Sequence, residues 1–203
     1  MDREQRDASR ADDDRAGLIR HLEQTLGPIE MGFRLEPDER HTPFQIARFL
    51  GGSGRDSRAY CTVGLSTHVL QSPHSTRSIR LELLMIAPES APSSPVVSAI
   101  HQVAIGMLNA RRAVLRGEVI GPAGPMAISP RFEALYVAAP VYFSDGFATA
   151  VNEDGDAISI AWLVPITSRE AQFVFDNGWD AFESLLVHQD PDLTSFTRPE
   201  VLL

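Results

Sequence analysis

Apolar residues recur along the chain with a helical period in some stretches and a strand period in others. A helix is predicted to begin near Asp13 or Asp14 and to end at Gly27-Pro28, with one apolar face made of Leu18, Ile19, Leu22 and Leu26. The apolar positions from Val96 to Arg116 predict a longer amphipathic helix. Alternating or continuously apolar runs predict strands at residues 29–35, 44–50, 60–65, 79–87, 134–139 and 157–165.

Two further helices are predicted near the C-terminus. Thr167 is placed to cap the first of them, and Glu170, three residues on, can bond back to the cap amide. Asn177-Gly178 favours a helix end, after which the pattern from Trp179 to His188 predicts the last helix.

The strands gather in two groups around one long helix, without the strict alternation of a parallel α/β fold. This order predicts the α+β class, with one mixed or mainly antiparallel sheet and helices packed on it. Residues 14–190 are predicted to form a single domain. The polar residues 1–13 are predicted to be a disordered tail, and residues 191–203 a loosely ordered one.

The net charge of −9 is unevenly distributed. Residues 1–132 contain 16 arginines and 15 acidic residues, whereas residues 133–203 contain 2 arginines and 12 acidic residues. Such a surface disfavours nucleic acid and anionic membranes as ligands and suits a basic protein partner, although it could also serve only solubility. If the acidic third binds the partner, the candidate residues are Asp176, Asp180 and Glu183.

The single cysteine, Cys61, allows no disulfide within the chain. The N-terminal residues contain no apolar signal segment, and no apolar run is long enough to cross a bilayer. These features predict a protein of the cytoplasm.

Four patterns could carry chemistry, and each has a simpler structural explanation. Cys61 could be a nucleophile paired with a histidine, but its strand-like neighbours favour a buried, inert thiol. His68 and His74 lack the further ligands of a zinc site. Asp154-Gly155-Asp156 fits a hairpin turn better than a calcium loop, and the glycines at 51–54 lack the lysine of a phosphate loop. We therefore expect no catalytic residue, no metal and no cofactor.

For three residues the sequence raises the question of whether the side chain is buried in the core. Glu82 lies in an otherwise apolar predicted strand, so an inward carboxylate would need a partner, and Arg80 on the same face is the nearest one. Trp162 is predicted to be in the core. Trp179 is also predicted to be in the core, with an exposed binding anchor as the alternative.

The order of these motifs resembles the suppressor-of-fused family over about residues 28–190. The resemblance rests on the sequence Tyr-Cys-Thr-Val-Gly-Leu-Ser at 60–66, on Arg-Leu-Glu-Leu-Leu at 80–84, on Trp-Leu-Val-Pro-Ile at 162–166 with Glu170, and on Gly178-Trp179. It implies an α/β sandwich that binds proteins. Eukaryotic members sequester Gli transcription factors. Bacterial members occur in toxin–immunity loci, and this short, lysine-free chain resembles those bacterial members.

The resemblance also implies where a partner would bind. In the eukaryotic members the ligand lies near the tyrosine that Tyr60 matches, so Tyr60, Gly64 and Ser66 are candidate contacts. The acidic loop that follows in those members is not matched here, because residues 67–71 read Thr-His-Val-Leu-Gln. Gly64 and Ser66 could equally be structural.

These observations together predict a non-enzymatic protein-binding domain, specifically an immunity-type protein that binds and neutralises a toxin. Two alternatives remain open at this point: a hydrolase whose site has no recognised motif, and a self-associating structural protein. The sequence does not fix the oligomeric state.

Overall fold

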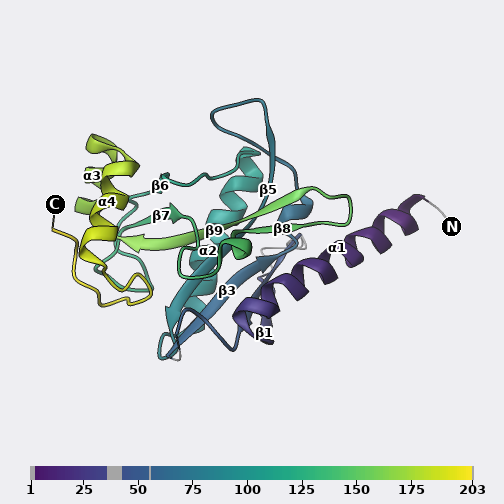
Figure 1. Ribbon diagram of the computed structural model, residues 1–203, viewed down its shortest axis with the longest axis horizontal. Helices are drawn as coiled ribbons and strands as arrows, with labels where there is room; N and C mark the ends of the chain where they lie inside the picture. Colours follow the sequence, from purple (N-terminus) through teal and green to yellow (C-terminus); the bar gives the residue numbers. More distant parts are fainter. Residues whose placement is uncertain (1–2, 36–42, 55, 203) are drawn as a thin grey trace.

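A computed structural model describes residues 3–35, 43–54 and 56–202, with side chains from Arg15 onward (Figure 1). The helices are α1 (Arg3–Leu26), α2 (Ser93–Ala110), α3 (Ser168–Asn177) and α4 (Trp179–Gln189). The strands are β1 (Ile29–Phe33), β2 (Gln45–Phe49), β3 (Ser57–Val63), β4 (Leu70–Gln71), β5 (Ser78–Pro88), β6 (Val119–Ile120), β7 (Ala134–Ala138), β8 (Thr149–Val151) and β9 (Ala157–Ile166). Two 3-10 turns, η1 (Leu65–Thr67) and η2 (Asp145–Ala148), complete the elements.

The strands form one mixed sheet in the order β1-β2-β3-β5-β9-β7-β6, with β4 paired to β5 and β8 paired to β9. All these pairs are antiparallel except β5 and β9, which run parallel. This confirms the predicted α+β class. The six predicted strands are present, whereas the short strands β4, β6 and β8 were not predicted, because two or three residues carry no readable period.

The central strands of the sheet are buried on both faces. Strand β2 illustrates the alternation, because Ile46 packs with the helix α2 side of the core and Phe49 packs with the α1 side. The α1 side also holds Phe182 of α4, while the α2 side holds Ile100. The sheet is therefore the middle layer, with α2 on one face and α1, α3 and α4 on the other.

The N-terminal prediction needs correction. Helix α1 begins at Arg3 instead of Asp13 or Asp14, so residues 3–13 are helical; residues 1 and 2 lie outside the described residues. Leu18, Leu22 and Leu26 are buried as predicted and fix the last turns of the helix on the sheet. Adding residues to a helix that is already nucleated costs little, which explains how a polar segment without apolar spacing continues it.

Helix α2 is also shifted from its prediction. It begins at Ser93 and ends at Ala110, where Arg111 adopts a left-handed conformation with φ 51°. The backbone of Arg111 and Ala113 then bonds to Gln71 instead of continuing the helix. The apolar residues Val114 and Leu115 therefore pack from the irregular segment that follows the helix.

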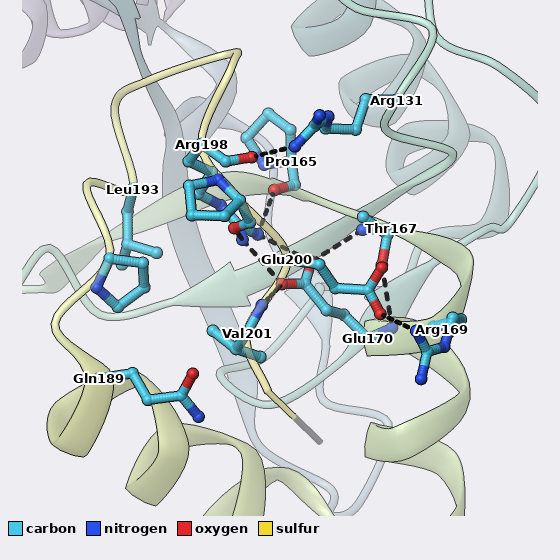
Figure 2. Close-up of polar contacts among 12 residues, drawn as sticks. Arg131, Pro165, Thr167, Arg169, Glu170, Gln189, Leu193, Arg198, Glu200 and Val201 are labelled. Atoms are coloured by element: carbon cyan, nitrogen blue, oxygen red, sulfur yellow. Dashed lines mark hydrogen bonds and ion pairs between the residues drawn. The ribbon is translucent and has the colours of Figure 1, made fainter.

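The C-terminal residues 191–203 were predicted to be loosely ordered, and this is wrong for the described part. Leu193, Phe196 and Val201 are buried, and Arg198 forms an ion pair with Glu170 in which both side chains are excluded from solvent. Figure 2 shows the tail wrapped around this pair. The apolar residues of the tail follow neither a helical nor a strand period, so the sequence pattern did not reveal their burial.

No helix among the described residues has both the length and the hydropathy needed to cross a membrane.

Candidate partner-binding site

A buried carboxylate organises the turn that the sequence singled out. Glu82 of β5 has no exposed surface and accepts five hydrogen bonds from the segment at the end of β3. Three donors are backbone N–H groups, those of Gly64 (3.0 Å), Leu65 (3.3 Å) and Ser66 (3.0 Å). The other two are the hydroxyls of Ser66 (2.7 Å) and Thr62 (2.6 Å). The turn is thus closed around a carboxyl group whose charged form burial alone would disfavour.

The groups that donate to Glu82 are themselves held in place by their neighbours. The Thr62 hydroxyl accepts a bond of 2.8 Å from the backbone N–H of Leu83, which directs its proton to Glu82. Gly64 has φ +98°, and a Cβ there would lie 3.1 Å from Arg15 Nε, so this position requires glycine. Gly64 and Ser66 therefore serve the turn itself.

Burial raises the pKa of Glu82, and the hydrogen bonds from Thr62 and Ser66 lower it in part, with a net pKa above the ordinary value. Burial also raises the pKa of the neighbouring Cys61 thiol, and the charge of Glu82 adds to this. Cys61 is fully buried, as predicted, and its thiol is therefore held in the protonated, unreactive form.

The predicted partner of Glu82 is wrong. Arg80 donates to the carbonyl oxygen of Ser66 at 3.0 Å and forms an ion pair of 3.3 Å with Asp156. Asp156 belongs to the predicted hairpin turn, which does join β8 to β9. Arg80 therefore ties the Gly64–Ser66 turn to this hairpin. The partners of Glu82 are backbone amides and hydroxyls, and no sequence pattern indicated these donors.

Tyr60 lies in the core instead of on the surface of the described structure. Its exposed fraction is 2%, and its hydroxyl shares a hydrogen bond of 2.9 Å with Ser93, the first residue of α2. Arg48 donates to the same Ser93 hydroxyl at 2.8 Å. A partner that approaches the turn from solvent would instead meet Thr67 and Val69, which are exposed.

The three acidic candidates lie on α3 and α4 but differ in their surroundings. Asp176 and Asp180 are exposed. Glu183 is half-buried, and it accepts hydrogen bonds from Nε and Nη2 of Arg116 and from the Tyr136 hydroxyl at 2.9 Å. Burial, followed by the contact with Glu183, raises the pKa of Tyr136. Glu183 therefore holds the helix pair to β7, while the two aspartates face solvent.

Trp179 stands between these aspartates in sequence and is partly exposed, at 39%. The core prediction for Trp179 was therefore wrong, whereas Trp162 is fully buried as predicted. One side of the Trp179 ring lies so close to Gly117 that a Cβ there would be 2.5 Å from it, and the Arg116 guanidinium lies 5.0 Å from the ring centroid. Trp179 is thus packed on one side and exposed on the other, and Phe175, four residues earlier at the end of α3, is exposed as well. We call Phe175, Asp176, Trp179 and Asp180 the α3–α4 surface.

Among the described residues, no group of His, Cys, Asp and Glu side chains is arranged to hold a metal ion. His68 is half-buried and His74 is exposed. Burial, with a smaller contribution from the charge of Arg15, lowers the pKa of His68.

The arrangement of a mixed sheet with α2 on one face and α1, α3 and α4 on the other is shared with solved structures. A protein described as a suppressor of fused homolog, from Neisseria gonorrhoeae FA 1090, has a TM-score of 0.72 at 15% identity, over 97% of this chain and 98% of that one. The Sufu–Fu complex gives 0.68 at 14% identity, over 93% of this chain and 91% of that one. Drosophila Suppressor of Fused gives 0.63 at 15% identity over 86% of this chain, which spans 46% of its length.

The family model of suppressor of fused protein (SUFU) matches residues 40–199. The chain belongs to this family, which confirms the resemblance inferred from its motifs. No curated protein sequence matches the chain significantly.

Proposed function

We propose that this domain is a non-enzymatic protein that binds a basic partner protein and blocks it, as an immunity protein neutralises a toxin. Membership of the suppressor of fused family supports protein binding, because one structure that the chain resembles is that of a member in complex with another protein, the Sufu–Fu complex. The acidic last third of the chain supports a basic partner.

The single observation that carries the proposal is the α3–α4 surface. Trp179 and Phe175 are exposed at 39% and 56%, and Asp176 and Asp180 accompany them. Tryptophan is enriched among residues that dominate binding energy, and an aromatic held in place before binding loses little entropy. Carboxylates at the rim attract a basic protein and exclude an acidic one.

The alternative of an enzyme has less support from the described residues. Cys61, the candidate nucleophile, is sealed in the core, and its raised pKa opposes formation of a thiolate. The buried Glu82 is occupied by five donors from its own chain. Self-association remains as a measurable alternative use of the α3–α4 surface.

The proposal is tested by expressing the protein encoded next to this one, with and without this domain, and measuring growth. We expect the neighbouring protein to arrest growth alone and the domain to restore it. Trp179→Ala should weaken protection, because truncation of a central aromatic anchor costs about 2 kcal/mol or more of binding energy.

Val187→Ala is the matched control, because Val187 is an exposed apolar residue near the other end of the same helix. It should protect as well as the wild type does. If the neighbouring protein arrests growth, the wild-type domain does not relieve the arrest and no complex forms, the immunity role is rejected. A stable dimer that Trp179→Ala dissociates would assign the surface to self-association.

A further inference from the structure

A groove of about 580 Å³ lies between helix α2 and the chain that leads through β6 into residues 121–128, on the opposite side of the sheet from α3 and α4. Its floor includes the buried side chains of Val103, Met107 and Leu135. Protein sites for small organic ligands have volumes of roughly 300–1,000 Å³ and are lined mainly by apolar side chains with a few polar groups. The groove therefore has the size and the lining of a small-ligand site.

The wall formed by residues 121–128 is fastened to the chain that enters β7. The backbone N–H of Ala123 donates to the carbonyl oxygen of Glu133 at 3.0 Å, and that of Met126 donates to the carbonyl oxygen of Phe132 at 2.9 Å. These bonds hold the wall in place without a ligand. A ligand that enters a formed site does not have to order its walls, which favours binding.

The α2 wall leaves space for a ligand near its middle. Gly106 is exposed and lines the groove, and a Cβ placed on it would meet no atom within 4 Å. A glycine inside a helix lowers helix stability relative to alanine. Because this glycine has no side chain, the groove stays open beside Met107, the next residue along the chain and part of the floor.

The charges that line the groove indicate one cationic group in the ligand. Arg112 and Glu118 form an ion pair at 2.8 Å and neutralise each other. Glu133 also lines the groove and is half-buried, and its carboxylate makes no hydrogen bond or ion pair with any residue that the structure describes. Leu135, two residues further on, belongs to the floor, so this carboxylate lies beside apolar surface. A cation there would be attracted more strongly than in water, because apolar surroundings reduce screening.

From these contacts we infer that the groove between α2 and β6 binds a small amphipathic amine. The apolar part of the amine lies on the floor and fills the space beside Gly106, and its ammonium group donates to the carboxylate of Glu133. A small molecule suits the groove better than an extended peptide, because β6 has only two residues and offers little strand edge. The site is separate from the α3–α4 surface, and it stands whether or not that surface binds a toxin.

The test measures how the whole chain binds dansylcadaverine, a fluorescent probe that joins an apolar ring system to a primary amine. We expect saturable binding with blue-shifted emission, because the ring system leaves water. The N-acetylated probe has the same apolar part without the charge, and it should bind about tenfold more weakly. Glu133→Gln should remove this difference between the two probes and leave the affinity for the acetylated probe unchanged.

A second variant tests the space in the α2 wall. Gly106→Leu should lower the affinity for both probes about tenfold, because the leucine side chain occupies the place of the ligand. Asn109→Leu is the matched control, because Asn109 is exposed on the same helix but does not line the groove, and it should leave both affinities unchanged. Thermal unfolding of each variant checks that it folds.

Amide chemical shifts locate the bound probe, and we expect changes in α2, β6 and residues 121–128. The inference would be overturned by the absence of saturable binding, by equal affinities of the wild type for the two probes, or by a preference for the amine that survives Glu133→Gln. Binding to Gly106→Leu that is as tight as to the wild type would also overturn it. Shift changes confined to α3 and α4 would place the probe on the α3–α4 surface and would contradict the site in the groove.

Discussion

At the scale of single residues, Glu82 is the side chain on which the Gly64–Ser66 turn depends. Its two oxygens accept hydrogen bonds from three backbone amides and two hydroxyls. On folding, these donors therefore replace their bonds to water with bonds to Glu82. Hydrogen bonds to a charged acceptor are stronger than neutral ones, and leaving their donors unpaired in the core is costly.

Glu82→Gln should therefore destabilise the protein. The amide NH2 group has no lone pair to offer, so the donors that face it lose their acceptor, at a cost of about 1–3 kcal/mol. Urea unfolding measures this change. Glu89→Gln, just beyond the same strand and in an exposed ion pair with Arg58, should cost less than about 1 kcal/mol and serves as the control. Equal effects of the two changes would contradict the role of Glu82.

The raised pKa of Glu82 also predicts how this difference changes with pH. A carboxyl that binds its proton more tightly in the folded state gives stability that is complete below its unfolded pKa, about 4.3, and is lost as pH rises through its folded pKa. The stability advantage of the wild type over Glu82→Gln should thus shrink as the pH is raised from 4. An advantage that grows with pH would mean that the five donors outweigh burial.

Cys61→Ser should cost stability but not partner binding. The serine hydroxyl would lie in a fully buried strand position, at a cost of about 1–3 kcal/mol. The wild-type thiol should also resist a bulky maleimide under native conditions and react after unfolding. Rapid native labelling would contradict the burial of Cys61.

At the scale of elements, the C-terminal tail is fastened by a buried ion pair. Arg198 donates to both oxygens of Glu170, at 2.7 and 2.8 Å, and also to the carbonyl oxygen of Pro165 (Figure 2). Glu170 accepts further bonds from the backbone of Thr167 and Val201. One carboxylate therefore caps helix α3 and holds the tail on it.

Arg198→Leu should be strongly destabilising, because it leaves Glu170 buried without its counterion, at a cost of about 3–5 kcal/mol. Arg169→Leu is the matched control. Its partner is Glu200 at 3.4 Å, and the Arg169 side chain is largely exposed, so its loss should cost about 1 kcal/mol or less. Thermal or urea unfolding of both variants makes the comparison. If Arg198→Leu is as mild as the control, the tail is not held by this pair.

The sequence predicted elements better than the contacts between them. The capping box of Thr167 and Glu170 was readable because a local spacing defines it, and the structure confirms it. The role of Glu170 as the anchor of Arg198 was not readable, because 28 residues separate the two. The inward position of Glu82 could be suspected from its apolar neighbours, but its amide donors depend on how β3 turns next to β5.

At the scale of the whole molecule, arginines from the first two thirds of the chain neutralise part of the acidic last third. Arg80 pairs with Asp156, and Arg116 pairs with Glu183. Asp176 and Asp180 remain at the surface beside Trp179. The charge imbalance could be counted from the sequence, but which acidic side chains face solvent follows only from packing. Glu183 shows this, because it was a candidate for partner binding and instead pairs with Arg116 and Tyr136.

The binding of the neighbouring gene's product to this protein, measured across salt concentration by stopped-flow and light scattering, tests the central claim most directly. We expect a one-to-one complex whose association rate falls as salt rises, because charges at the rim of an interface act mainly on that rate and are screened beyond about 8–10 Å. Asp176→Asn combined with Asp180→Asn should lower the rate at low salt and flatten its salt dependence. Absence of a complex at every salt concentration would contradict the claim.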